Sequence, residues 1–220
     1  MKPRRLCNIV LCLLLCAGAW AHNDSAQVAK PSIYNGTQIK LDIASPVVIA
    51  GVNNWHMQHY EIAANVRLAQ RYYPTVELGY AGGSTTKGDS ITYRGNGGFI
   101  RVGADINPLK KHPESPHALL VGLRLGTAVQ GAKQGLTTDS WHPYSTRADV
   151  WGEIVAGCQV EIAQVNNTSF YMGWMGRFKC LFTRQNEYTP AADMWPIYIP
   201  GFGKRDNIGW GLNYYLGWRF

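Results

Sequence analysis

The 220-residue sequence predicts an all-β fold, and within that class an eight-stranded antiparallel transmembrane β-barrel. The strongest observation is the segment 208–220, in which apolar residues alternate with small or polar residues throughout and which ends on an aromatic residue. A period of two over this length is typical of a long strand with one apolar and one polar face. Seven earlier segments alternate in the same way, and the chain begins with a segment typical of exported proteins.

The first 21 residues predict a signal peptide. A basic start, with Lys2, Arg4 and Arg5, precedes an apolar run over residues 6–15 that is too short to span a bilayer. Small residues at the two positions that a signal peptidase reads place the cleavage after Ala21. The leader therefore predicts export from the cytoplasm.

Cleavage would change the charge and the cysteine content. Three basic residues would leave with the leader, so the net charge would fall from +7 to +4, with 18 basic residues against 14 acidic ones. That charge is too small and too dispersed to favour nucleic acid. Of five cysteines only Cys158 and Cys180 would remain, so no disulfide framework is expected. No later apolar run is long enough for a membrane helix, so a membrane-embedded form must be a closed barrel.

Residues 22–36 predict an unstructured periplasmic lead-in, and residues 37–220 predict the barrel. The eight predicted strands span residues 37–48, 58–71, 75–82, 90–106, 118–131, 146–163, 168–183 and 208–220. In each strand, every second residue points to the same face, and we call the two alternating sets the apolar parity and the polar parity. The apolar parity of the first four strands holds Ile39, Leu41 and Ile43, then Tyr60, Ile62 and Val66, then Val76, Leu78 and Tyr80, then Ile100, Val102 and Ala104. That of the last four holds Val121, Leu123 and Leu125, then Val150, Ile154 and Val160, then Phe170, Met172 and Phe178, then Trp210 and Leu212.

The connections between the predicted strands differ in length on the two sides. Four outer loops are expected, at about residues 50–57, 83–89, 132–145 and 184–206, and they grow toward the carboxy end. The three periplasmic turns are expected at about residues 72–74, 107–117 and 164–167. Long loops on one side and short turns on the other are typical of outer-membrane barrels.

The polar parity is expected to face the barrel interior and the apolar parity to face lipid. The polar parity is rich in glycine, and its charges nearly balance, which suits a crowded lumen better than a solvated exterior; a soluble ligand-carrying barrel would have the opposite orientation. Eight strands enclose a lumen only wide enough for side chains, and buried charges must pair. We expect a closed plug rather than a selective pore. The expected interior ion-pair network is Arg67, Glu77, Arg101, Asp105, Arg124, Glu153, Glu161, Arg177, Lys179 and Arg219.

The last strand also predicts a membrane-facing terminal signal. Its members share the apolar parity at the carboxy end and are Tyr214, Leu216, Trp218 and Phe220. Aromatic residues near strand ends, such as Trp218, suit the headgroup girdles of a membrane barrel.

One distinctive stretch is Pro-Ile-Tyr-Ile-Pro-Gly-Phe-Gly-Lys at residues 196–204, followed by Trp-Gly-Leu-Asn-Tyr-Tyr at residues 210–215. Together with residues 121–126, residues 152–153, residues 171–174 and Arg177, it resembles an uncharacterised family of outer-membrane β-barrels from Bacteroidetes, which is designated a domain of unknown function. The resemblance covers about residues 58–220, and the stretch 196–204 is its most specific part. It implies the location and the fold but no catalytic residue. More loosely, the chain is similar to small OmpA-like and OmpX-like barrels, whose roles are structural or adhesive.

The longest outer loop is the best candidate for recognition. Its aromatic residues Tyr188, Trp195, Tyr198 and Phe202 alternate with prolines that limit its freedom. Aromatic side chains on a stiffened loop give a large contact surface at low entropic cost. The alternative is that these aromatic side chains pack over the barrel mouth as a lid.

Two other residue sets carry reactive groups but predict no site. Asp139, Ser140 and His142 have the residue types of a hydrolase triad, but neighbours in sequence rarely reach triad geometry. His56 and His59 have the spacing of two metal ligands, but lack a third ligand nearby. We expect no catalytic residue, no cofactor, no metal site and no enzyme activity.

The sequence therefore predicts a non-enzymatic structural or surface-interaction role in the outer membrane of a Gram-negative bacterium. The expected partners are outer-membrane lipid and, during insertion, the barrel-assembly machinery. The alternatives are a narrow channel for ions or small solutes and a lipid-modifying outer-membrane enzyme.

Overall fold

The structure is a computed structural model that describes residues 33–43, 56–87, 91–109, 115–136, 141–143, 146–183, 198–204 and 206–220. Within these ranges every regular element is a strand. No helix in the described part of the chain is long and apolar enough to cross a membrane.

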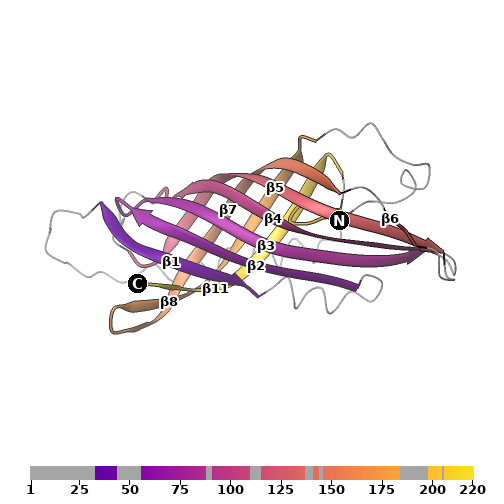
Figure 1. The fold of residues 1–220 in the computed structure, drawn as a ribbon. Coiled ribbons are helices and arrows are strands. Elements are labelled where there is room, and N and C mark those ends of the chain that lie inside the picture. Colours follow the sequence, from indigo (N-terminus) through magenta and orange to yellow (C-terminus); the bar gives the residue numbers. More distant parts are fainter. Residues whose placement is uncertain are drawn as a thin grey trace, which may run out of the picture. The chain divides into compact units, whose positions relative to one another are not determined.

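Eight long strands form one antiparallel sheet that closes on itself (Figure 1). In chain order they are β1 (Tyr34–Asp42), β2 (His56–Leu68), β3 (Tyr72–Lys87), β4 (Ile91–Ile106), β5 (Ala118–Leu136), β7 (Arg147–Val165), β8 (Thr168–Leu181) and β11 (Ile208–Arg219). Each strand pairs with the next one, and β1 pairs with β11 to complete the barrel. The structure thus confirms the all-β class and the eight-stranded antiparallel barrel.

Three short strands lie outside this closed set. The strand β6 (Trp141–Pro143) pairs with β5 at one end of the barrel, as Figure 1 shows. The strands β9 (Tyr198–Ile199) and β10 (Gly203–Lys204) form a small hairpin. We call the end of the barrel that holds this hairpin and β6 the loop side, and the end where β1 begins and β11 ends the chain-end side.

Two of the expected outer loops are wrong in part. Residues 83–87 continue β3, and residues 132–136 continue β5, while residues 141–143 form β6. In this extension Arg94 of β4 pairs with Lys133 of β5, so the ladder continues through polar and glycine-rich sequence. Backbone hydrogen bonds hold such a ladder whatever the side chains, and an alternation of apolar residues is therefore not required.

The outward face of the barrel is apolar around its whole circumference. Direct cross-strand partners form two continuous rows, and the most exposed members include Leu123 at 65% and Trp210 at 77%. One row crosses β11, β1, β2, β3 and β4 and consists of Leu216, Leu41, Ile62, Leu78 and Ile100. The other crosses β5, β7, β8 and β11 and consists of Leu123, Ile154, Phe178 and Trp210.

The inward face is arranged in three layers along the barrel axis. The layer on the loop side is a buried apolar cluster of Ala81, Phe99, Ala128, Trp151, Tyr198, Ile199 and Phe202. The layer on the chain-end side is a second buried cluster of Tyr73, Ala118, Leu120, Val155, Met175 and Tyr215. Between the two clusters lie buried charged side chains, among them Glu77, Arg101, Arg124, Glu153 and Arg177, which form the middle layer.

Candidate functional site

The middle layer is centred on Arg177 of β8, which contacts three carboxylates. Its Nη1 lies 2.9 Å from Glu77 Oε2 and 2.8 Å from Glu153 Oε2, and its Nη2 lies 3.3 Å from Glu61 Oε1. The guanidinium side chain and its partners are each at most 4% exposed. Because Arg presents its donors in a planar fork, one guanidinium bridges carboxylates from three different strands.

A second guanidinium, that of Arg101, contacts the same three carboxylates. It forms an ion pair with Glu61, and its other nitrogens lie 3.0 Å from Glu77 and 3.4 Å from Glu153. Arg124 extends the network toward the chain-end side, with ion pairs of 3.1 Å to Glu77 and 2.7 Å to Asp105. The structure therefore brings together six of the ten residues expected in the interior network, namely Glu77, Arg101, Asp105, Arg124, Glu153 and Arg177.

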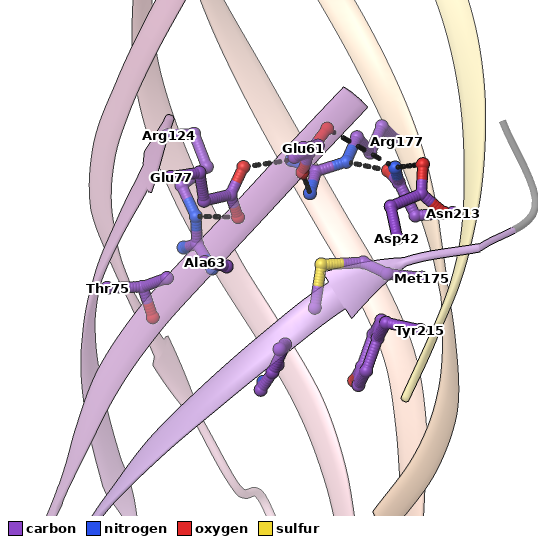
Figure 2. A pocket seen from close by; sticks show the side chains of 11 residues that line it. Asp42, Glu61, Ala63, Thr75, Glu77, Arg124, Met175, Arg177, Asn213 and Tyr215 are labelled. Carbon is purple, nitrogen blue, oxygen red and sulfur yellow. Dashed lines mark hydrogen bonds and ion pairs between the residues drawn. The ribbon is translucent and has the colours of Figure 1, made fainter. Parts of the chain in front are cut away.

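Three interior residues that the sequence interpretation left out complete the layer. Glu61 pairs with both central arginines, and Asn213 accepts a hydrogen bond from Arg177. Asn213 also donates to Asp42 Oδ2 at 2.8 Å, and Figure 2 shows these side chains converging from β2, β8, β11 and β1. Glu61 has the same parity as Arg67, so its alternation was a sufficient signal to include it.

The charges of the middle layer balance. The cations Lys40, Arg101, Arg124 and Arg177, with Lys179 at the loop-side edge of the layer, equal in number the carboxylates Asp42, Glu61, Glu77, Asp105 and Glu153, which makes five of each sign. Removing one partner would leave a charge buried without compensation, and such a charge is costly in a poorly solvated interior.

A small cavity lies between the charged layer and the chain-end cluster. Its volume is about 20 Å³, and its walls include Lys40, Glu77, Arg124, Arg177 and Tyr215 (Figure 2). A cavity of this size has room for roughly one water molecule. The interior is therefore filled rather than open at this level.

The β9–β10 hairpin fills the loop side of the barrel. Tyr198 is 6% exposed and Phe202 is 2% exposed, and the Phe202 ring meets the Trp151 ring edge-on with centroids 6.0 Å apart. Lys179 Nζ donates to the carbonyl oxygens of Gly201 at 2.5 Å and Phe202 at 3.2 Å. Burial raises the pKa of Tyr198 to about 12, so its phenol stays protonated at neutral pH. The hairpin is thus held against the inner face of the barrel by hydrogen bonds from Lys179 and by aromatic packing.

This burial corrects one expectation for the longest loop. Tyr198 and Phe202 pack inward as a lid, so these two side chains do not belong to an exposed recognition surface. Tyr188 and Trp195 lie outside the described residues. The local sequence, rich in proline and glycine, predicts a loop but not the direction in which it folds.

Replacing Phe202 with Ala is expected to release the hairpin while leaving the barrel closed. The change removes a buried aromatic side chain, a loss of about 3–5 kcal/mol in a packed core, but it leaves the pairing of all eight long strands intact. We expect faster proteolytic cleavage in residues 184–207 and an unchanged cleavage rate elsewhere. Lys204→Ala, at an exposed hairpin position, is the matched control and is expected to cleave like the parent chain.

The other expected network residues have different contacts. Lys179 holds the hairpin carbonyls as described. Arg219 lies 3.5 Å from Glu161 at the chain-end side, where the two side chains are 17% and 15% exposed. Arg67 Nη2 donates to the carbonyl oxygen of Ser115 at 3.1 Å, and its Nε donates to that of Gln70. These residues line the periphery of the charged layer.

The residues of the expected terminal signal face outward, whereas His59 of the expected histidine pair lies inside the barrel. Tyr214, Leu216, Trp218 and Phe220 lie on the outward face, each partly or fully exposed. His59 packs inside the barrel, 5.4 Å between ring centroids from Phe99, and its Nε2 lies 3.5 Å from Glu61. His56 and His142 lie in β2 and β6, whereas Asp139 and Ser140 lie outside the described residues.

Taken together, the fold and the interior define a closed eight-stranded antiparallel β-barrel filled by its own side chains. Comparison with known families places the chain more narrowly. Residues 4–219 match the family described as a domain of unknown function (DUF6048), and the chain belongs to that family. A comparison with curated proteins gave no match.

Proposed function

We propose that this chain is an outer-membrane β-barrel of a Gram-negative bacterium with a non-enzymatic structural or surface-interaction role. The observation that carries the proposal is the apolar outer wall, which crosses all eight strands in register. Soluble proteins rarely expose apolar patches of more than a few hundred Å², whereas a barrel in lipid requires an apolar band around its circumference. Hydrocarbon is therefore the environment that fits this surface.

The spacing of outward aromatic residues supports the same environment. Tyr72 and Tyr80 of β3 are eight residues apart, and Trp218 and Trp210 of β11 have the same spacing. Eight residues of strand cover about 26 Å at roughly 3.3 Å per residue. With a strand tilt of about 40° this is a height of roughly 20 Å, which covers most of the apolar band of about 25 Å that aromatic girdles flank in outer-membrane barrels.

Membrane fractionation followed by gel electrophoresis without boiling tests the proposal. We expect the mature chain in the outer-membrane fraction, extracted only by detergent, and we expect the unboiled form to migrate differently from the boiled one. A closed barrel stays compact in detergent until it is heated, which causes this shift. Recovery of the chain in the periplasm or the medium would contradict the proposal.

The filled interior supports a closed barrel rather than a channel. The hairpin, the charged layer and the chain-end cluster each cross the lumen, and the cavity between the last two holds only about 20 Å³. In planar lipid bilayers we expect the purified protein to give no conductance above background, while a large open barrel in the same bilayer gives clear steps. Reproducible steps from the purified protein would favour the channel alternative.

A further inference from the structure

Charges on the barrel wall are divided unequally between its two faces. All carboxylates on the eight long strands face the lumen, and they are Asp42, Glu61, Glu77, Asp105, Asp149, Glu153 and Glu161. Among the strand residues whose side chains the structure describes, only Arg94 of β4 and Lys133 of β5 are charged and face outward. The outer wall therefore carries positive charge at one place.

These two cations meet at a single aromatic ring. Arg94 and Lys133 are direct cross-strand partners. Arg94 Cζ lies 5.0 Å from the ring centroid of Trp141 in β6, and Lys133 Nζ lies 4.8 Å from it. Like charges directly opposite on neighbouring strands repel each other, and the ring face attracts both without supplying a full negative charge. Neither cation forms an ion pair with a carboxylate that the structure describes. The pair is thus complementary to an anion.

The position of the pair relative to the apolar band narrows the kind of anion. Tyr80, Gly98 and Val129 are successive cross-strand partners, and Tyr80 belongs to the aromatic girdle on the loop side. Arg94 and Lys133 each lie four residues further toward the loop side, about 13 Å along the strand at roughly 3.3 Å per residue. With a strand tilt of about 40° this is roughly 10 Å of height, so in the proposed membrane orientation the pair lies at the outer edge of the headgroup region of the outer leaflet.

We propose that Arg94, Lys133 and Trp141 bind the phosphate group of a phosphorylated lipid in the outer leaflet. The guanidinium of Arg94 offers a phosphate two parallel hydrogen bonds, and the ammonium of Lys133 adds a second charge. Trp141, 39% exposed, has an apolar ring that contacts both cations and one polar N–H that can donate to a phosphate oxygen. This inference rests on the membrane location proposed above and adds a lipid partner to it.

Native mass spectrometry of the full mature chain in detergent micelles tests the inference. The probes are bisphosphorylated lipid A and the same lipid after removal of its phosphates. One basic residue near an anionic lipid surface contributes about fivefold in affinity, so R94Q and K133Q are each expected to weaken binding of the phosphorylated lipid about fivefold, and the double variant about 25-fold. K204Q removes an exposed cation of the hairpin and is expected to bind like the parent chain.

The outcomes separate this inference from the proposed function. Equal binding of both lipids by the parent chain, or an unchanged preference in the double variant, would overturn the phosphate site. Binding of inorganic phosphate alone as tightly as the phosphorylated lipid would overturn the lipid assignment. The parent chain and each variant are first run unboiled on a gel, which shows whether the barrel has folded. Absence of the mobility shift in the parent chain would contradict the proposed membrane barrel and not the phosphate site. Removing one of two repelling charges is expected to leave the barrel as stable as before.

Discussion

Replacing Arg177 with Met is expected to lower the free energy of unfolding by about 3–5 kcal/mol, because it breaks a buried network from one side only. The guanidinium contacts Glu61, Glu77 and Glu153, and Arg101 alone would then have to offset most of their charge. Met fills a similar volume without providing a donor. Equilibrium unfolding by urea in detergent micelles, followed by tryptophan fluorescence, measures the change.

Arg219→Met is the matched control for this prediction. Arg219 also pairs with a carboxylate, Glu161, but at 3.5 Å and with both side chains partly exposed. Exposed ion pairs contribute about 0–1 kcal/mol, so a small effect is expected. Equal effects of the two substitutions would mean that the interior network does not hold the barrel together.

Gly126→Val is expected to lower the free energy of unfolding by about 1–3 kcal/mol through overpacking. A Cβ atom at Gly126 would lie 2.3 Å from Cε2 of Trp151, its cross-strand partner. Trp151 is fully buried, and its Nε1 donates to Glu153 Oε1 at 2.7 Å while its ring meets Phe202. The indole cannot move aside without disturbing both the charged layer and the hairpin.

Gly131→Val tests the same change where there is space. No heavy atom lies within 4 Å of a Cβ built at Gly131, which belongs to the same strand, β5. Because valine favours strands over glycine, the urea midpoint is expected to stay the same or to rise. If Gly131→Val lowered the free energy of unfolding as much as Gly126→Val, the loss would come from placing valine in β5 and not from the contact with Trp151.

The alternation of the sequence was sufficient to predict most of the wall. Residues such as Leu123, Ile154 and Trp210 carry a strict period of two, and the structure places all of them outward. The polar parity likewise predicted that Arg101 and Arg177 face the lumen. Periodicity assigns a face to each side chain, because a strand leaves only two choices.

Contacts inside the barrel depend on information that alternation does not contain. Which carboxylate meets Arg177 depends on the register between strands and on the tilt of the barrel, so alternation indicates that Glu61 faces the lumen but not that it pairs with Arg177. The inward hairpin depends on a fit between Phe202 and the space that Gly126 leaves beside Trp151. Lys179 was expected to pair with a carboxylate but donates to backbone carbonyl groups, since the hairpin comes within its reach.

The place where β1 meets β11 has a consequence for assembly. The register of these strands holds five residue pairs, continued by backbone hydrogen bonds between Thr37 and Phe220 and between Ile43 and Tyr214, whereas twelve pairs join β11 to β8. Until β11 pairs with both neighbours, β1 and β8 present unpaired backbone groups, which the hydrocarbon of the proposed membrane location would not tolerate. In that proposed location, entry into the bilayer and joining of the two ends are therefore expected in one step. A factor that guides this step would need to bind β11 after it has paired with β8 and before it pairs with β1.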